Sequence, residues 1–190
     1  MDTWRYRSSS TGIVWPALPN PRASAILALL FQLERSQWFP AEELRRLQAG
    51  QLSRLVDHAR RTVRFYRDRL AQLDPDRELD EAAWLRLPLL TRAEIQEAGE
   101  HLVSTDIPED HGGTTEIFTS GSTGKPVRSL RTKLWELYWS AFTIRDHLWH
   151  RRDLTGKLAA IRDTAKGKAL YPHGETIPSW GPSSGRVFET

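Results

Sequence analysis

The stretch FTSGSTGKP, residues 118–126, concentrates small, hydroxyl-bearing and cationic residues in one short segment. Its two glycines let the backbone take positive φ angles and approach a ligand closely. Its four hydroxyl groups, its consecutive amides and its single ammonium group can converge on an anion. The segment therefore predicts a loop that binds the phosphates of a polyphosphate ligand. The predicted binding residues are Thr119, Ser120, Gly121, Ser122, Thr123, Gly124 and Lys125.

Two better-known phosphate-binding patterns do not fit this segment. A Walker A loop needs glycine at the position of Thr119 and serine or threonine at the position of Pro126. A dinucleotide fingerprint needs GxGxxG between a strand and a helix, whereas we predict strands on both sides, at residues 116–119 and 127–131. A flexible connector is the alternative that the composition leaves open, and the order of the residues favours a ligand site.

Hydrophobic spacing predicts helices over residues 22–38, 41–73, 92–101 and 132–150, with Gly50 as a candidate break in the second. Apolar residues of the second helix recur every three or four positions and predict a buried stripe. This stripe comprises Leu52, Leu55, Val56, Ala59, Val63, Tyr66 and Leu70. The arginines of the same helix alternate with acidic residues, which favours a solvated face over one that binds RNA or a membrane.

The start of the third helix carries a local signal. Thr91 and Glu94 have the spacing of a capping box, in which each side chain bonds the other residue's amide. Further on, residues 157–161 and 187–188 predict strands, and the segment 165–185 is rich in Gly, Pro and Ser.

These elements predict an α/β fold that is mainly helical to about residue 105 and then enters a mixed β-sheet, with the phosphate loop at its edge. Residues 1–21 contain three prolines and predict an irregular arm, pinned to the body by Trp4, Tyr6 and Trp15. We expect residues 22–190 to form the main domain.

The composition limits the class of protein. Apolar residues make up 39% and charged residues 27% of the chain, and the net charge of +3 does not indicate a nucleic-acid partner. No cysteine is present, which excludes disulfides and is compatible with the cytoplasmic location that we expect. The longest apolar stretch, residues 23–33, is too short to span a membrane and lacks the features of a signal peptide.

Two further groups of residues on the helix predicted at 132–150 could form sites. His147 and His150 are three residues apart, but no third metal ligand stands at a recognisable spacing, so polar residues at a helix end are the favoured interpretation. Trp135 and Trp139 share a face and could line an aromatic pocket, although core packing is favoured. Apolar groups around most of this helix predict burial on more than one side.

The segment FTSGSTGKPV resembles the phosphate-binding motif of the adenylate-forming (AMP-binding) superfamily. Its lysine precedes the proline and Val127-Arg128 follows it, a variant similar to the phenylacetate–CoA ligase, coenzyme F390 synthetase and CapK-like branch. The segments QLSRLVDHARRTVRFYRDRL (51–70) and LPLLTRAEIQ (87–96) are also similar to that branch. The resemblance covers roughly residues 44–160.

The resemblance implies an incomplete N-terminal portion of the large domain of a ligase that activates a carboxylic acid with ATP and Mg²⁺, with coenzyme A as a possible acceptor. The loop residues named above would hold the β- and γ-phosphates. The later family motifs and the catalytic lysine are absent, and the chain ends at Thr190 inside a predicted strand. We therefore expect a premature C-terminus, no catalytic residue and little ligase activity. A stand-alone nucleotide- or phosphate-binding module, or a degenerate non-catalytic protein, is the alternative.

Overall fold

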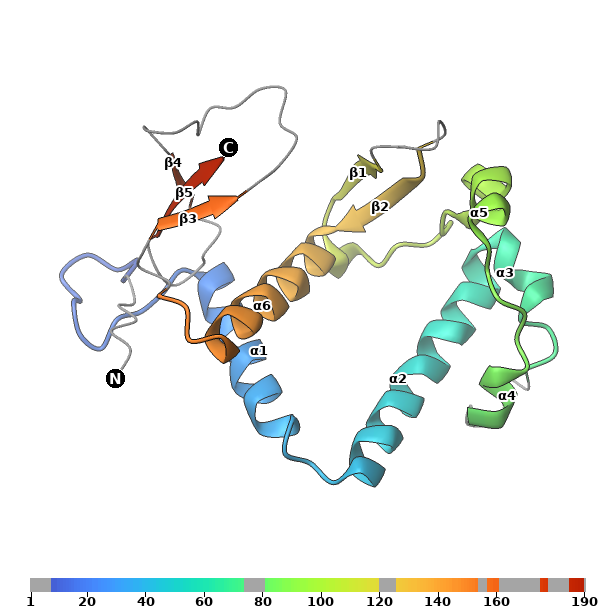
Figure 1. The fold of residues 1–190 in the computed structure, drawn as a ribbon, viewed down its shortest axis with the longest axis horizontal. Helices are drawn as coiled ribbons and strands as arrows, with labels where there is room; N and C mark the ends of the chain where they lie inside the picture. The colour runs from blue at the N-terminus through green and yellow to red at the C-terminus, as the bar shows by residue number, and fades with distance from the viewer. Residues whose placement is uncertain are drawn as a thin grey trace. The chain divides into compact units, whose positions relative to one another are not determined.

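The fold is described from a computed structural model (Figure 1). The structure describes residues 8–73, 81–119, 126–153, 157–160, 175–177 and 185–189. The chain divides into two compact units, and each is described by itself. The first combines Met1–Gln37 with Trp135–Thr190, and the second is Trp38–Leu134. No helix in the described ranges combines the length and the apolar character needed to cross a membrane.

The first unit begins with α1, Pro21–Ser36, close to its predicted start and end. Proline at the first helical position suits a helix start, and the Asn20 side chain caps it by accepting from the amide of Ala23 at 2.9 Å. Residues 8–20 contain no helix or strand. The prediction that Trp15 pins this segment is wrong, since Trp15 is 82% exposed. Trp4 and Tyr6 lie outside the described residues.

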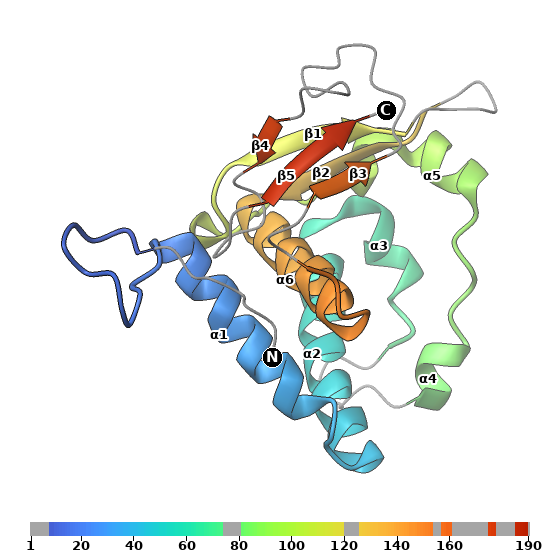
Figure 2. The same ribbon diagram turned by 60° about the vertical axis from the view of Figure 1, so that its left-hand side comes forward.

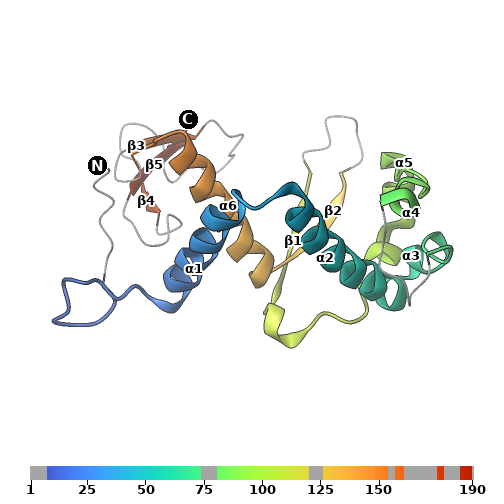
Figure 3. The ribbon, with the colours of Figure 1, turned by 90° about the horizontal axis from the view of Figure 1, so that it is seen from below.

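Helix α6, Lys133–Trp149, packs against α1 (Figure 3). The buried contacts are made by Ile26, Leu30, Ala141 and Ile144, with partly buried leucines around them. The predicted burial of α6 on several sides is wrong, because α1 covers only a narrow stripe. Large side chains outside that stripe are exposed, namely Trp135, Tyr138, Trp139, Phe142 and Trp149.

A three-stranded sheet follows in the same unit (Figure 2). Its strands are β3 (Lys157–Ala160), β4 (Glu175–Ile177) and β5 (Gly185–Glu189), in the order β3-β5-β4. The β3–β5 pair is parallel and the β4–β5 pair is antiparallel, so the sheet is mixed. The strands predicted at 157–161 and 187–188 are present, whereas β4 lies in a segment that its Gly, Pro and Ser content did not mark as a strand.

The second unit opens with α2, Ala41–Thr62, and α3, Arg64–Arg69. Gly50 does not divide the helix as predicted. The break is at Val63, whose φ of −114° and ψ of 111° are extended. The predicted stripe does form a core, with Val56, Leu70 and Leu73 buried together and Leu52, Ala59 and Tyr66 packed around them. Leu55 is the exception and is 60% exposed.

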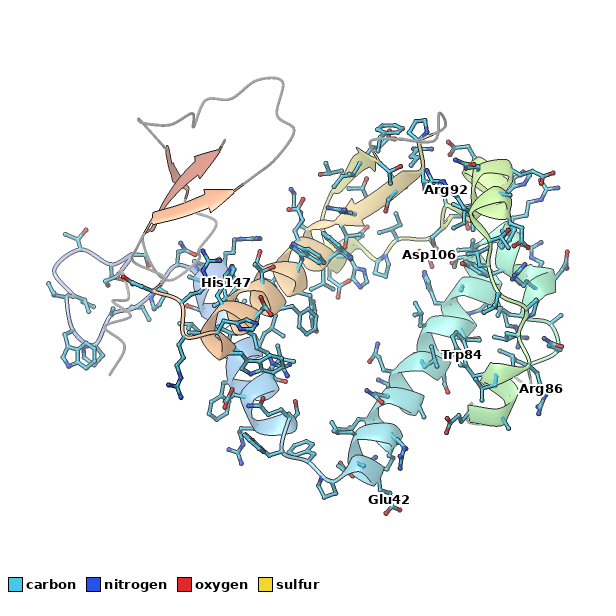
Figure 4. The ribbon with its side chains drawn as sticks, in the orientation of Figure 1. Glu42, Trp84, Arg86, Arg92, Asp106 and His147 are labelled. Atoms are coloured by element: carbon cyan, nitrogen blue, oxygen red, sulfur yellow. The ribbon has the colours of Figure 1, made fainter. Side chains whose placement is uncertain are left out.

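Short helices follow α3 in the chain and precede β1. They are α4 (Glu81–Leu85), α5 (Arg92–Ala98), and the 3₁₀ helices η1 (Gly99–Leu102) and η2 (Glu109–His111). Figure 4 labels Trp84 and Arg86 at α4 and Arg92 at the start of α5. The helix predicted over 92–101 ends earlier as an α-helix, because Gly99 takes a positive φ of 49°.

The capping box at the start of α5 is confirmed. The Glu94 amide donates to the Thr91 hydroxyl at 3.3 Å, and the Thr91 amide donates to the Glu94 carboxylate at 2.7 Å. Arg69 of α3 bonds the same carboxylate at 2.8 Å and the carbonyls of Pro88 and Leu89 at 2.9 and 2.6 Å. One network of hydrogen bonds therefore joins the cap of α5 to the end of α3.

We expect this hydrogen-bond network to make the free energy of unfolding depend on pH. Hydrogen bonds from the Thr91 amide, then from its hydroxyl and from Arg69, lower the pKa of Glu94 from 4.5 to about 2. Because the folded pKa is the lower one, the carboxylate stabilises the fold fully above pH 4.5, and that contribution is lost as the pH falls toward 2. In urea unfolding followed by circular dichroism, Glu94→Gln should be less stable than the parent near neutral pH, and the difference should shrink across this range. A difference that stays constant would contradict the assignment.

The predicted strands around the loop form an antiparallel hairpin, β1 (Thr114–Phe118) and β2 (Arg128–Thr132) (Figure 1). Its register pairs Thr114 with Thr132 and Phe118 with Arg128. The prediction of one mixed sheet with the loop at its edge is wrong, since in the described part of the chain β1 and β2 pair only with each other. Neighbouring strands joined by a short connection pair locally, whereas β3 comes after the whole of α6. The coarse α/β character of the chain remains.

Candidate functional site

The hairpin closes directly below the predicted phosphate loop. The Thr119 amide donates to the Val127 carbonyl at 3.0 Å, and the Val127 amide donates to the Thr119 hydroxyl oxygen at 2.9 Å. Thr119 is thus the one predicted site residue that the structure describes, and its hydroxyl holds the two ends of the loop together. Ser120, Gly121, Ser122, Thr123, Gly124 and Lys125 lie outside the described residues.

Arg128, the first residue of β2, connects the hairpin to η1. Its guanidinium bonds Glu116 of β1 at 2.6 Å and also bonds Glu100 of η1. The hydrogen bond that Arg128 donates to the Glu116 carboxylate is the main reason that the pKa of Arg128 is raised. The Arg128 side chain is about one-third exposed. Its position is therefore fixed by its bonds to the two carboxylates and not by burial. The strand that leaves the loop is therefore fixed to a second element.

The residues before β1 also contact the first residue of α6. Gly112 has a φ of 73°, which favours glycine, and a Cβ added there would lie 2.9 Å from the Cβ of Lys133. The Lys133 amide donates to the Gly113 carbonyl at 3.2 Å. The positive φ and the close approach of the Lys133 side chain both require a residue without a Cβ at position 112.

A cavity of about 670 Å³ lies next to the hairpin, inside the second unit. Its walls come from α2, from η1 and the residues after it, and from Pro126, Val127 and β2. Since Pro126 and Val127 directly follow the predicted loop, the cavity and the loop share a segment of chain. The cavity was not predicted, although the spacing of Gln51, Arg54, Leu55 and His58 along one face of α2 carried a signal for it.

A serine and a histidine meet in the wall of this cavity. Ser104 Oγ lies 3.4 Å from His58 Nε2, 3.0 Å from Thr62 Oγ1 and 2.8 Å from the carbonyl of Asp106, which Figure 4 labels. Thr62 donates its own hydrogen to the His58 carbonyl, so it can only accept from Ser104. Ser104 has one hydrogen for three possible acceptors, of which the Asp106 carbonyl at 2.8 Å is the nearest, and the role of His58 Nε2 depends on the tautomer of the ring. The Asp106 carbonyl thus competes with His58 for the hydrogen that a nucleophilic serine would give to its base.

His147, in the last turn of α6, and His150, directly after the helix, both lie close to charged neighbours. His147 Nδ1 lies 3.0 Å from the Arg152 guanidinium, and His150 lies 3.7 Å from Asp146. Burial, then the charge of Arg152, lowers the pKa of His147, which is labelled in Figure 4. Within the described residues, no group of three or more His, Cys, Asp and Glu side chains is placed to hold a metal ion.

The aromatic pair on α6 also differs from the favoured interpretation. Trp135 and Trp139 stack with ring centroids 5.3 Å apart and an interplanar angle of 11°. They are 37% and 60% exposed, so they share a face as predicted but do not belong to the buried core. The stack is exposed, and neither tryptophan lines the cavity next to the hairpin.

Comparisons of this chain with models of protein families, with curated proteins and with solved structures found no match.

Proposed function

We propose that this chain is an N-terminal portion of an ATP-dependent ligase that activates carboxylic acids as acyl-adenylates, related to acyl- or aryl-CoA ligases. The loop at residues 119–125 binds the β- and γ-phosphates of Mg²⁺–ATP. The motif FTSGSTGKPV is the observation that carries this proposal. The segments at 51–70 and 87–96 support it by their similarity to the same branch of the adenylate-forming superfamily.

The surroundings of the loop are compatible with this role. Reciprocal bonds between Thr119 and Val127 close the hairpin, and Arg128 attaches its outgoing strand to η1. A loop whose ends are fixed loses less conformational freedom when it closes around a ligand. During adenylation the carboxylate attacks the α-phosphate and pyrophosphate leaves. Amides and a cation that are already in place around the leaving pyrophosphate would stabilise the charge that develops there.

The chain alone is not expected to catalyse the complete reaction. The family's adenine, ribose and catalytic-lysine motifs do not occur in these 190 residues. Groups that act together in catalysis cannot be removed without losing most of the rate. The expected property of this chain is therefore binding of Mg²⁺–ATP without acyl-adenylate formation.

Calorimetric titration of the full chain with Mg²⁺–ATP tests the loop. We expect Gly121→Ala and Lys125→Ala each to weaken binding by about tenfold or more, through loss of close backbone approach and of the ammonium group. Lys157→Ala removes the same charge from β3 and serves as the matched control, with affinity equal to that of the parent. Loop variants that bind as tightly as the parent would overturn the assignment.

The second candidate is a stand-alone nucleotide- or phosphate-binding module, a function that would need only the motif at residues 118–126. The two candidates differ in partner chemistry. A ligase portion, supplied in trans with the missing parts of a phenylacetate–CoA ligase-like enzyme, should exchange labelled pyrophosphate into ATP when a carboxylic acid is present. A binding module should not support this exchange under any such condition.

A further inference from the structure

We propose that the cavity between α2, η1 and β2 is a binding site for a small organic anion with an apolar body, and that Arg54 and His58 bind its anionic group. This site differs from the loop at 119–125, and the proposal does not require that loop to bind ATP. The volume of about 670 Å³ lies within the range of roughly 300–1,000 Å³ that small-molecule sites occupy.

Apolar side chains line the same cavity as Arg54 and His58. Leu55 comes from α2, and Leu102, Val103 and Ile107 come from η1 and the segment after it. Leu55 is 60% exposed although the neighbouring positions of the predicted stripe are packed in the core. A ligand with an apolar body would remove this surface from water, which favours its binding.

The charges around the cavity favour an anion at the α2 side. The charged residues in its wall are Arg54, Glu100 and Arg128. Arg128 and Glu100 already form an ion pair, to which Glu116 contributes a second carboxylate. No residue in the described part of the chain bonds the Arg54 guanidinium, so this is the cation in the wall whose charge remains available to a ligand. A guanidinium binds carboxylate and phosphate oxygens with paired N–H donors.

His58 adds a second donor one turn further along α2. Its Nε2 lies 3.4 Å from Ser104 Oγ, and no residue in the described part of the chain bonds its Nδ1. In the tautomer that carries the ring hydrogen on Nδ1, His58 donates to an anionic ligand there. Arg54 and His58 are four positions apart and both line the cavity, so both can address one anionic group.

Calorimetric titration of the full chain with sodium octanoate, octyl phosphate and octanamide tests the proposal. We expect at least one of the two anions to bind, and neutral octanamide to bind about tenfold more weakly or worse. Tighter binding of octanoate would identify a carboxylate as the natural group, and tighter binding of octyl phosphate would identify a phosphate ester. Failure of both anions to bind would overturn the proposal.

Variants separate this cavity from unspecific binding. Arg54→Gln should weaken binding of the preferred anion by about tenfold and leave the weak binding of octanamide unchanged. Arg45→Gln is the matched control, because nine positions along α2 place Arg45 on the opposite side of the helix, outside the cavity. Leu55→Asn should weaken binding of the anion and of the amide alike, through loss of apolar contact. Circular dichroism establishes that each variant is folded, and an Arg54→Gln protein that is folded and binds the anion as the parent does would refute the assignment.

Discussion

Replacement of Ile26 by alanine should lower the free energy of unfolding by about 2–5 kcal/mol. Ile26 is 0% exposed and packs with Leu30 of its own helix and with Ala141 and Ile144 of α6. This cluster is the buried contact between α1 and α6, and alanine would leave a cavity in it. Urea unfolding followed by circular dichroism measures the loss.

Ile13→Ala provides a matched control for this prediction. The same atoms are removed, but Ile13 is 46% exposed and precedes α1. Surface substitutions usually change the free energy of unfolding by only about 0.5 kcal/mol. Equal losses in the two variants would show that the α1–α6 cluster does not stabilise the first unit.

Replacement of Gly112 by alanine should lower the free energy of unfolding by roughly 2–4 kcal/mol. It should also weaken the proposed binding of Mg²⁺–ATP by residues 119–125. At Gly112, φ is 73° and ψ is −176°, a combination that is essentially restricted to glycine. The added Cβ would lie 2.9 Å from Lys133 Cβ, so the start of α6 or the base of the hairpin would have to shift. Unfolding in urea and titration with Mg²⁺–ATP measure the two effects.

Gly113→Ala is the neighbouring control. A Cβ at Gly113 has nothing within 4 Å, and this residue does not have a positive φ. We expect its stability and its affinity for Mg²⁺–ATP to remain close to those of the parent. If Gly112→Ala is as stable as Gly113→Ala, the backbone at the base of the hairpin is not constrained in the way described.

Features that depend on neighbouring residues were predictable from the sequence. The box formed by Thr91 and Glu94 needs only the three-residue spacing that both helix geometry and the sequence contain. The strands on either side of the loop were predicted to within two residues, because a short connection between two strand-like segments favours local pairing. The identity of the loop's ligand rests on the motif and stays a prediction.

Features that depend on distant partners were not predictable in the same way. The helix break falls at Val63 instead of Gly50, since a single glycine costs only about 1 kcal/mol and packing of Leu70 and Leu73 onto Val56 outweighs it. The exposed side of α6 could not be inferred from its composition, which contains more apolar groups than α1 covers. The cavity could not be predicted, because its walls come from elements that are distant from one another in the sequence.

The bonds of Arg128 have a consequence for how this sequence can evolve. Arg128 directly follows the predicted phosphate-loop motif, yet its two partners, Glu100 and Glu116, belong to η1 and to the opposite strand. A lysine carries the same charge but lacks the forked group that can bond two separate carboxylates at once. Mutational drift at this position is therefore restricted by residues outside the motif, and a change at Arg128 would leave two like charges near each other until a second substitution removed one of them.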